Sequence, residues 1–135
     1  MIEPLIHVSA VVFRDVNDRV LTVRKRGTEK FMFPGGKPEL GESALDTAIR
    51  EVKEEIGIGL EAKQLTQIGV YEAPAANEAK HTVVATVFTY DGDTIEPQMA
   101  AEIAELSWVS PDQPDVVLAP LLADFVFPAI NSKVS

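Results

Sequence analysis

Residues 36–58, GKPELGESALDTAIREVKEEIGI, contain the clearest helix in the chain. Ser43 has the chemistry of an N-cap, and Asp46 stands three residues later, where a capping box more often has Glu or Gln. Gly57 is placed to end the helix. These signals predict a helix over residues 43–56. Apolar residues recur there at helical spacing and predict one stripe facing a core: Leu45, Ala48, Ile49, Val52 and Ile56.

The same helix has a second, acidic side. Glu51, Glu54 and Glu55 are spaced i, i+3 and i+4, so their side chains share one side, away from the apolar stripe. Each like-charge pair costs a few tenths of a kcal/mol in an isolated helix. A divalent cation such as Mg²⁺ would remove that repulsion, because hard cations prefer carboxylate oxygens. Taken alone, the helix fits equally well a solvated acidic face with Arg50 and Lys53 as ion-pair partners.

The rest of the chain alternates between apolar runs and turn signals. Residues 5–14 and 20–24 are rich in β-branched residues, and residues 15–18 (DVND) between them predict a hairpin. Residues 31–33 (FMF) form a short apolar run that ends at Pro34. Further strands are predicted at residues 64–72, 82–90 and 105–109, and a last helix at residues 118–130. This organisation indicates one mixed α/β domain over residues 1–135, without repeats or linkers.

Composition excludes several classes of function. The chain has 135 residues, a formal net charge of -9 and no cysteine. Disulfides, thiolate nucleophiles and cysteine-based zinc sites are therefore excluded. The negative charge argues against binding a nucleic acid polymer, which needs a basic footprint. No apolar run reaches the roughly 20 residues that span a bilayer, and the N-terminus lacks a basic signal region. We expect a cytoplasmic protein that does not bind membranes.

The spacing around the acidic helix carries a more specific signal. Gly36 is followed by five residues and Glu42, then by seven residues and REVKEEIGI, residues 50–58. This pattern resembles the complete signature of Nudix hydrolases, and the preceding FPGGK, residues 33–37, is similar to the approach in MutT-like members. The resemblance implies a Nudix α/β/α sandwich with a mixed β-sheet and with the motif on a loop-helix-loop.

The resemblance also implies roles for individual residues. Mg²⁺, with Mn²⁺ as a substitute, would be held by Glu51, Glu54, Glu55, the backbone carbonyl of Gly35, and Glu102. Arg50 would orient a glutamate through a charge-assisted hydrogen bond. Glu42 would be either an outer metal ligand or a structural partner within the motif, beside the structural glycines Gly36 and Gly57.

The reaction implied is hydrolysis of a diphosphate bond in a nucleoside di- or triphosphate, or in a nucleoside diphosphate derivative. Metal-activated water would attack phosphorus, with Glu54, Glu51 and Arg50 as catalytic residues. The base that takes the water proton would be a motif glutamate or a later acid, Glu102 or Glu105. For Glu105, ordinary surface charge is the preferred interpretation.

Basic and aromatic residues are candidates for contacts with the rest of the substrate. Lys37, Arg24 and Arg26 would hold phosphates, although each could equally be a solvated surface charge. The aromatic candidates for a nucleobase pocket are Phe31, Phe33 and Tyr71, and core packing is preferred for at least two of them.

Two other functions are compatible with the fold. A non-catalytic Nudix domain that senses a nucleotide is the alternative, although such domains typically lose motif glutamates that this chain keeps. Isopentenyl diphosphate isomerases share the fold but use a catalytic cysteine, which is absent here. The expected partner is therefore a small nucleotide, and the resemblance leaves a homodimer open.

Overall fold

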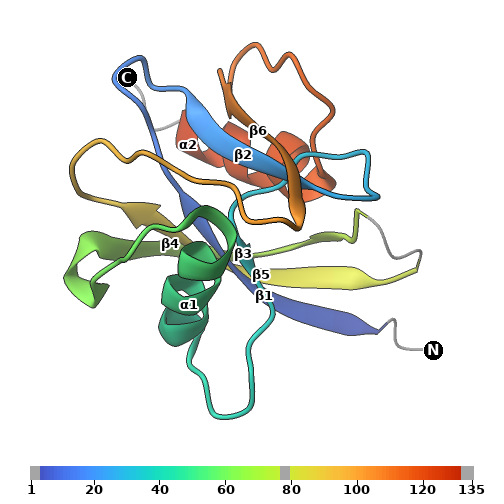
Figure 1. The fold of residues 1–135 in the computed structure, drawn as a ribbon. Helices are drawn as coiled ribbons and strands as arrows, with labels where there is room; N and C mark the ends of the chain where they lie inside the picture. The colour runs from blue at the N-terminus through green and yellow to red at the C-terminus, as the bar shows by residue number, and fades with distance from the viewer. Residues whose placement is uncertain (1–3, 77–79, 132–135) are drawn as a thin grey trace.

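The computed structural model describes residues 4–76 and 80–131 (Figure 1). The larger sheet has the strand order β3-β1-β5-β4, and a two-stranded sheet pairs β2 with β6. β1 runs parallel to β5, whereas the other pairings between these named strands are antiparallel, which confirms a mixed sheet. The strands are β1 (Leu5–Val12), β2 (Val20–Lys25), β3 (Gly35–Gly36), β4 (Leu65–Pro74), β5 (Thr82–Tyr90) and β6 (Ile103–Val109). The helices are α1 (Ala44–Ile56), the 3₁₀ turn η1 (Ala62–Gln64), the π-helix η2 (Leu121–Val126) and α2 (Phe127–Asn131).

Helices cover both faces of the larger sheet. The end of β1 is buried on both sides: Val11 packs into one core cluster with Val52 of α1, whereas Val12 packs into another with Leu122 of η2. Successive side chains of a strand point to opposite faces, so this alternation supplies both cores. The expected α/β/α arrangement is confirmed.

Local chemistry explains why α1 begins and ends where it does. The Ser43 hydroxyl accepts a hydrogen bond from the Asp46 N–H at 3.0 Å, and the Asp46 carboxylate accepts from the Ser43 N–H at 3.3 Å. Aspartate therefore completes the capping box despite its shorter side chain. Gly57 ends the helix in the left-handed conformation, with φ of 72°, and donates its N–H to the carbonyl of Lys53.

The predicted hairpin forms only next to its turn, because β1 and β2 belong to different sheets. The turn forms as expected, since the Asp18 N–H donates to the Asp15 carbonyl at 3.0 Å and Arg14 makes one antiparallel bridge with Val20. Beyond that bridge the strands separate. β1 becomes an inner strand between β3 and β5, and β2 pairs with β6 instead. Both strands are apolar on two faces, so their pattern could not identify their partners.

The last helix begins later than predicted, at Leu121. Leu118 is extended and makes a parallel bridge with Phe31, whose N–H donates to the Val117 carbonyl at 2.8 Å. β6 also begins two residues earlier than predicted, at Ile103. Among residues 4–76 and 80–131, no helix combines the length and apolarity that crossing a bilayer requires.

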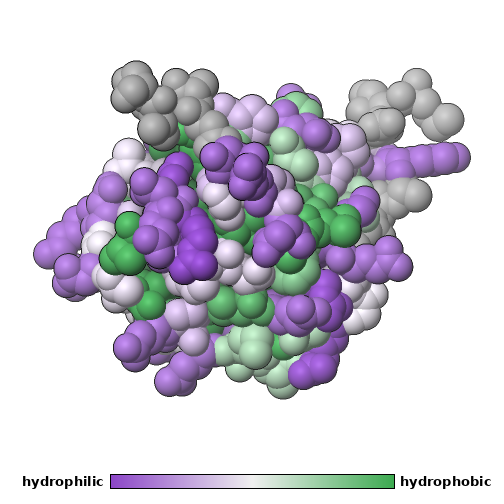
Figure 2. Space-filling model, turned by 90° about the horizontal axis from the view of Figure 1, so that it is seen from above, coloured by the Kyte–Doolittle hydropathy of each residue, from purple (hydrophilic) through white to green (hydrophobic). Residues whose placement is uncertain are grey.

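Hydrophilic and hydrophobic side chains alternate on the molecular face seen from above (Figure 2). The large apolar side chains that are exposed come from separate parts of the chain, among them Leu5, Val16, Leu40 and Val70. Scattered residues of this kind are ordinary on a protein surface.

Candidate active site

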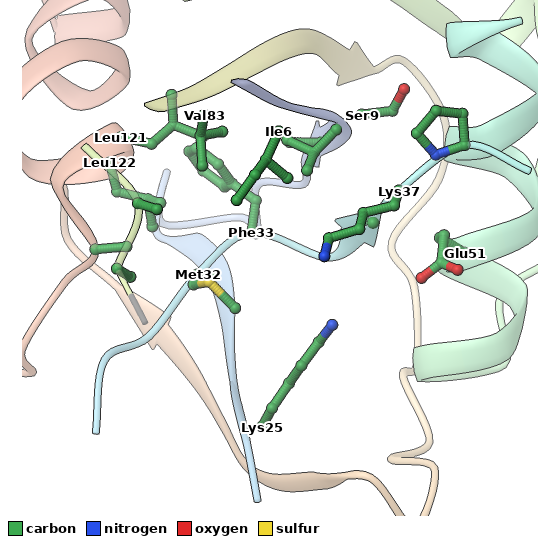
Figure 3. A pocket seen from close by; sticks show the side chains of 18 of the residues that line it. Ile6, Ser9, Lys25, Met32, Phe33, Lys37, Glu51, Val83, Leu121 and Leu122 are labelled. Carbon is green, nitrogen blue, oxygen red and sulfur yellow. The ribbon is translucent and has the colours of Figure 1, made fainter. Parts of the chain in front are cut away.

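A pocket of about 640 Å³ connects α1 to η2 along one face of the larger sheet (Figure 3). One end is polar, where the side chains of Lys25 and Lys37 extend into the cavity near Glu51. The other end is apolar and lies beside η2. The pocket therefore joins a charged region on the motif helix to an apolar chamber, in the volume range of small-molecule sites.

Two glycines bring the backbone close to α1. A Cβ atom on Gly36 would overlap the carboxylate of Glu51, and one on Gly35 would overlap the carbonyl of Ser9. Gly35 also has φ of 151°, which side-chain-bearing residues rarely adopt. Because both positions lack a side chain, the Gly35 N–H reaches Oε1 of Glu55 at 2.9 Å. The glycine strand β3 thus fixes the position of the motif helix.

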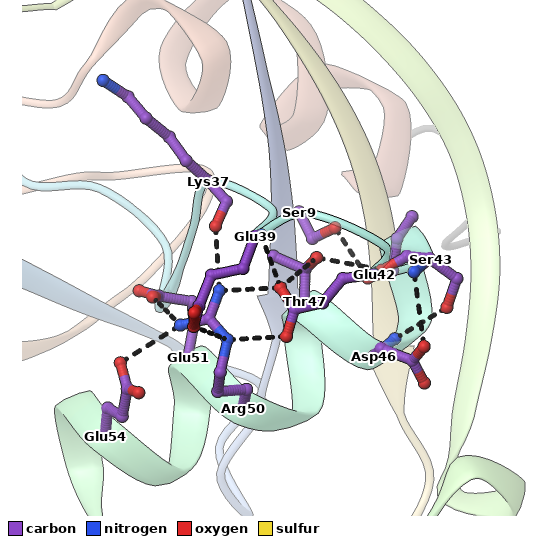
Figure 4. Close-up of polar contacts among 11 residues, drawn as sticks. Ser9, Lys37, Glu39, Glu42, Ser43, Asp46, Thr47, Arg50, Glu51 and Glu54 are labelled. Carbon is purple, nitrogen blue, oxygen red and sulfur yellow. Dashed lines mark hydrogen bonds and ion pairs between the residues drawn. The ribbon is translucent and has the colours of Figure 1, made fainter.

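Arg50 lies at the centre of the motif network (Figure 4). Its Nε and Nη2 donate to the Glu42 carboxylate at 2.7 and 2.9 Å. Nη1 donates to Glu51 at 2.6 Å and to Glu54 at 3.2 Å, while Nη2 also donates to the Lys37 carbonyl at 2.9 Å. One planar guanidinium therefore holds two of the acidic-face glutamates and ties the loop before α1 to the helix.

Glu42 makes the contacts of a structural partner. Its carboxylate also accepts hydrogen bonds from the Glu39 N–H at 2.7 Å and the Thr47 hydroxyl at 3.1 Å. Chiefly because Arg50 donates to it, the pKa of Glu42 falls to about 2. The same bond is the main cause that raises the pKa of Arg50. Of the two roles that the sequence left open, these contacts favour the structural one.

The three glutamates of the acidic side occupy different environments. The side chain of Glu54 is 53% exposed and that of Glu51 is 16% exposed, whereas Glu55 is only 1% exposed. Burial raises the pKa of Glu55 to about 7, although the Gly35 N–H and Lys25 act in the opposite direction. Oε2 of Glu55 has no hydrogen-bond partner, even though Nζ of Lys25 lies 3.4 Å away. In the described part of the chain, no three acidic or histidine side chains converge as a ready metal site.

The prediction that Arg24 and Arg26 face the cleft is wrong for the pocket that the structure contains, since neither lines it. Arg24 donates to Glu105 at 2.6 Å, and Nε of Arg26 donates to the Ala101 carbonyl at 2.5 Å. Lys25, which lies between them, enters the pocket instead. Sequence reasoning missed Lys25, because residues 20–23 are all buried and their pattern does not show which side of β2 faces the pocket.

The remaining candidates divide between the pocket and other regions. Glu102 lines the pocket together with Lys37, whereas Glu105 pairs with Arg24, in agreement with its interpretation as surface charge. Phe33 also lines the pocket and packs edge-to-face on Phe127, with ring centroids 6.0 Å apart. Phe31 and Tyr71 are not among the pocket residues. Phe31 is buried, whereas Tyr71 is partly buried and packs against a core cluster.

Burial of Glu55 predicts a pH-dependent stability in the absence of metal. Its pKa in the folded protein, about 7, lies above the usual 4.5, so the folded state holds the proton more tightly. This contribution to stability is fully present below about pH 4.5 and is lost as the pH rises through about 7. Urea unfolding in EDTA should show a falling free energy between about pH 5 and 8, and Glu55→Gln should remove that component. An equal fall in both proteins would contradict the assignment.

Known proteins are similar to this chain along most of its length. Residues 4–128 match the NUDIX domain model. A MutT-like protein of Streptomyces ambofaciens is 30% identical over 93% of this chain and 77% of its own, and an ADP-ribose pyrophosphatase of Methanocaldococcus jannaschii is 35% identical over 67% and 52%. The crystal structure of a MutT protein from Methanosarcina mazei superposes with a TM-score of 0.78 at 25% identity, covering 98% of this chain and 99% of the other. With its full motif assembled around Arg50, the chain belongs to the NUDIX family and is a MutT-like hydrolase of that family.

Proposed function

We propose that this hydrolase cleaves a diphosphate bond in a nucleoside di- or triphosphate, or in a nucleoside diphosphate derivative, with Mg²⁺ as cofactor. The observation that carries the proposal is the pocket itself, in which Glu51 and two lysines lie at one end of a chamber large enough for a nucleotide. The relative named an ADP-ribose pyrophosphatase supports a substrate of this kind.

The residues near the motif fit a hard divalent cation. Oε2 of Glu55 is a buried carboxylate oxygen without a hydrogen-bond partner, and its nearest cation is Nζ of Lys25 at 3.4 Å. Glu51 and Lys25 line the pocket, whereas Glu55 lies outside its lining. Glu51, Glu54 and Glu55 would hold Mg²⁺, or Mn²⁺ in its place, with the Gly35 carbonyl and Glu102 as further oxygen ligands. When bound, the metal lowers the pKa of water and neutralises charge on the phosphate oxygens.

The side chains of the chain itself supply position and proton transfer. Arg50 holds Glu51 and Glu54 through Nη1, so both carboxylates are oriented before substrate arrives. A motif glutamate, Glu54 or Glu51, or the later acid Glu102 would take the proton of the attacking water, and of these Glu51 and Glu102 line the pocket. Lys25 and Lys37 extend into the polar end of the pocket, where their ammonium groups bind the phosphate oxygens of the substrate.

A substrate panel tests the function. The purified protein is incubated with nucleoside triphosphates, nucleotide sugars, ADP-ribose and dinucleoside polyphosphates, with Mg²⁺ or with EDTA, and the products are separated by chromatography. We expect cleavage of at least one class with Mg²⁺ and none with EDTA. Nucleotide binding without cleavage of any class would favour a nucleotide-sensing domain instead.

Lys25 and Arg24 form a matched pair for testing phosphate binding. Lys25 enters the pocket, whereas Arg24 is its neighbour on β2 and pairs with Glu105 outside it. A hydrogen bond to a charged group contributes about 1.5–3 kcal/mol, so Lys25→Ala should raise KM about 10- to 100-fold. Arg24→Ala should change KM by less than about threefold. Steady-state kinetics on the cleaved substrate measure both, and equal effects would exclude a specific role for Lys25.

A further inference from the structure

The apolar end of the pocket has walls from four parts of the chain (Figure 3). Ile6 of β1 and Val83 of β5 are register partners on adjacent parallel strands, so their side chains lie side by side on one face of the sheet. Phe33 and Met32 close a second side, and η2 closes a third. The apolar residues that line this end include Ile6, Val8, Met32, Phe33, Val83 and Leu122.

This end offers little to a polar group. Within residues 4–76 and 80–131, the side chains that line it are apolar, whereas the charged residues of the pocket lie toward α1. A site that hydrogen-bonds a substrate strongly rejects an analogue that lacks the bonding group. An apolar pocket instead binds a ligand more tightly for each additional methyl group that it buries. The lining of this end therefore favours recognition by ring faces and methyl groups.

The two ends form one continuous cavity. Lys25 and Lys37 would hold the phosphates beside Glu51, which leaves the organic part of the substrate to extend along the sheet toward η2. The nucleobase would then contact Phe33 and Val83, and a flat ring packs well against aromatic and aliphatic side chains.

We propose that this apolar end binds the nucleobase by packing, and that the enzyme prefers a base with an added methyl group and tolerates the loss of a polar exocyclic group. The inference rests on the proposed function, because it assumes that the phosphates lie at the lysine end. Val83 is the specificity-determining residue that we select for testing, since it lines the pocket and is only partly buried.

Matched substrate pairs test the proposal in the Mg²⁺-loaded enzyme. dTTP and dUTP differ by one methyl group, and one buried methyl group should favour dTTP in kcat/KM by roughly three- to fivefold. dITP lacks the exocyclic amino group of dGTP and should be cleaved within about threefold of dGTP or faster. A kcat/KM for dTTP equal to or below that for dUTP, or a loss of more than about threefold with dITP relative to dGTP, would overturn the proposal.

Two isosteric variants test whether the dTTP preference arises at the pocket wall formed by Val83. Val83→Thr keeps the shape of the side chain but adds a hydroxyl to the pocket wall, and it should reduce the dTTP preference to near unity. Val84→Thr makes the same change at the next residue of β5, which is partly buried but is not a pocket residue, and it should keep the wild-type ratio. Thermal unfolding of both variants checks that the fold is retained. An unchanged ratio in folded Val83→Thr would exclude this wall as the binding surface.

A binding measurement separates this proposal from the hydrolase proposal. Calorimetric titration in EDTA compares thymidine monophosphate with deoxyuridine monophosphate and needs neither metal nor turnover. Tighter binding of the thymidine nucleotide by roughly three- to fivefold would support the apolar site even in an enzyme that cleaves neither triphosphate. Equal affinity would overturn the proposal even if the triphosphates are hydrolysed.

Discussion

The guanidinium of Arg50 is the constraint on which the site depends. It donates to Glu42, Glu51, Glu54 and the Lys37 carbonyl, so the loop that precedes α1 and the acidic side of that helix are held by one group. Three glutamates within two helical turns would otherwise repel one another. The planar fork of arginine can donate in several directions at once, which the single ammonium of lysine could not do with the same geometry.

The glycines of β3 allow the backbone to approach the glutamates of α1, which Arg50 alone cannot achieve. Gly36 approaches the Glu51 carboxylate without a side chain, and Gly35 places its N–H on Oε1 of Glu55. Glu55 is consequently buried with one oxygen satisfied and the other lacking a hydrogen bond. An ionised carboxylate in such a place is costly, and its raised pKa expresses that cost. A bound cation would compensate it, so the burial that destabilises the isolated charge also favours a metal ligand.

Local signals in the sequence predicted the motif region well. Ser43, Asp46 and Gly57 gave the bounds of α1 because capping depends on neighbouring residues only. Long-range pairings were not predictable in the same way. The turn at Asp15–Asp18 formed, yet β1 and β2 entered different sheets. Buried residues lie on two faces of each strand, so the sequence pattern could not identify their partners. The start of the last helix was displaced for a similar reason, since Leu118 pairs with Phe31, far away in the sequence.

The positions of the basic residues in the site also could not be predicted from the sequence. Arg24, Lys25 and Arg26 are consecutive, and only the face that β2 turns toward the pocket decides which of them enters it. Both Val20 and Leu21 at the start of the strand are buried, so hydrophobic alternation left that face undetermined. The pocket lining likewise combines residues from β1, β5 and η2 whose proximity follows from the fold, whereas the sequence alone pointed only to aromatic residues as candidates for base binding.

Binding of Mn²⁺, followed by electron paramagnetic resonance of the free ion, tests most directly whether the acidic side of α1 holds a cation. The wild-type protein is compared with Glu54→Gln and with Glu96→Gln, which alters an exposed glutamate outside the pocket. We expect Glu54→Gln to weaken Mn²⁺ binding at least about tenfold and to lower turnover by about 10²–10⁴, with the urea midpoint unchanged. Glu96→Gln should match the wild type in all three. Wild-type Mn²⁺ affinity and turnover in Glu54→Gln would contradict a metal site on α1.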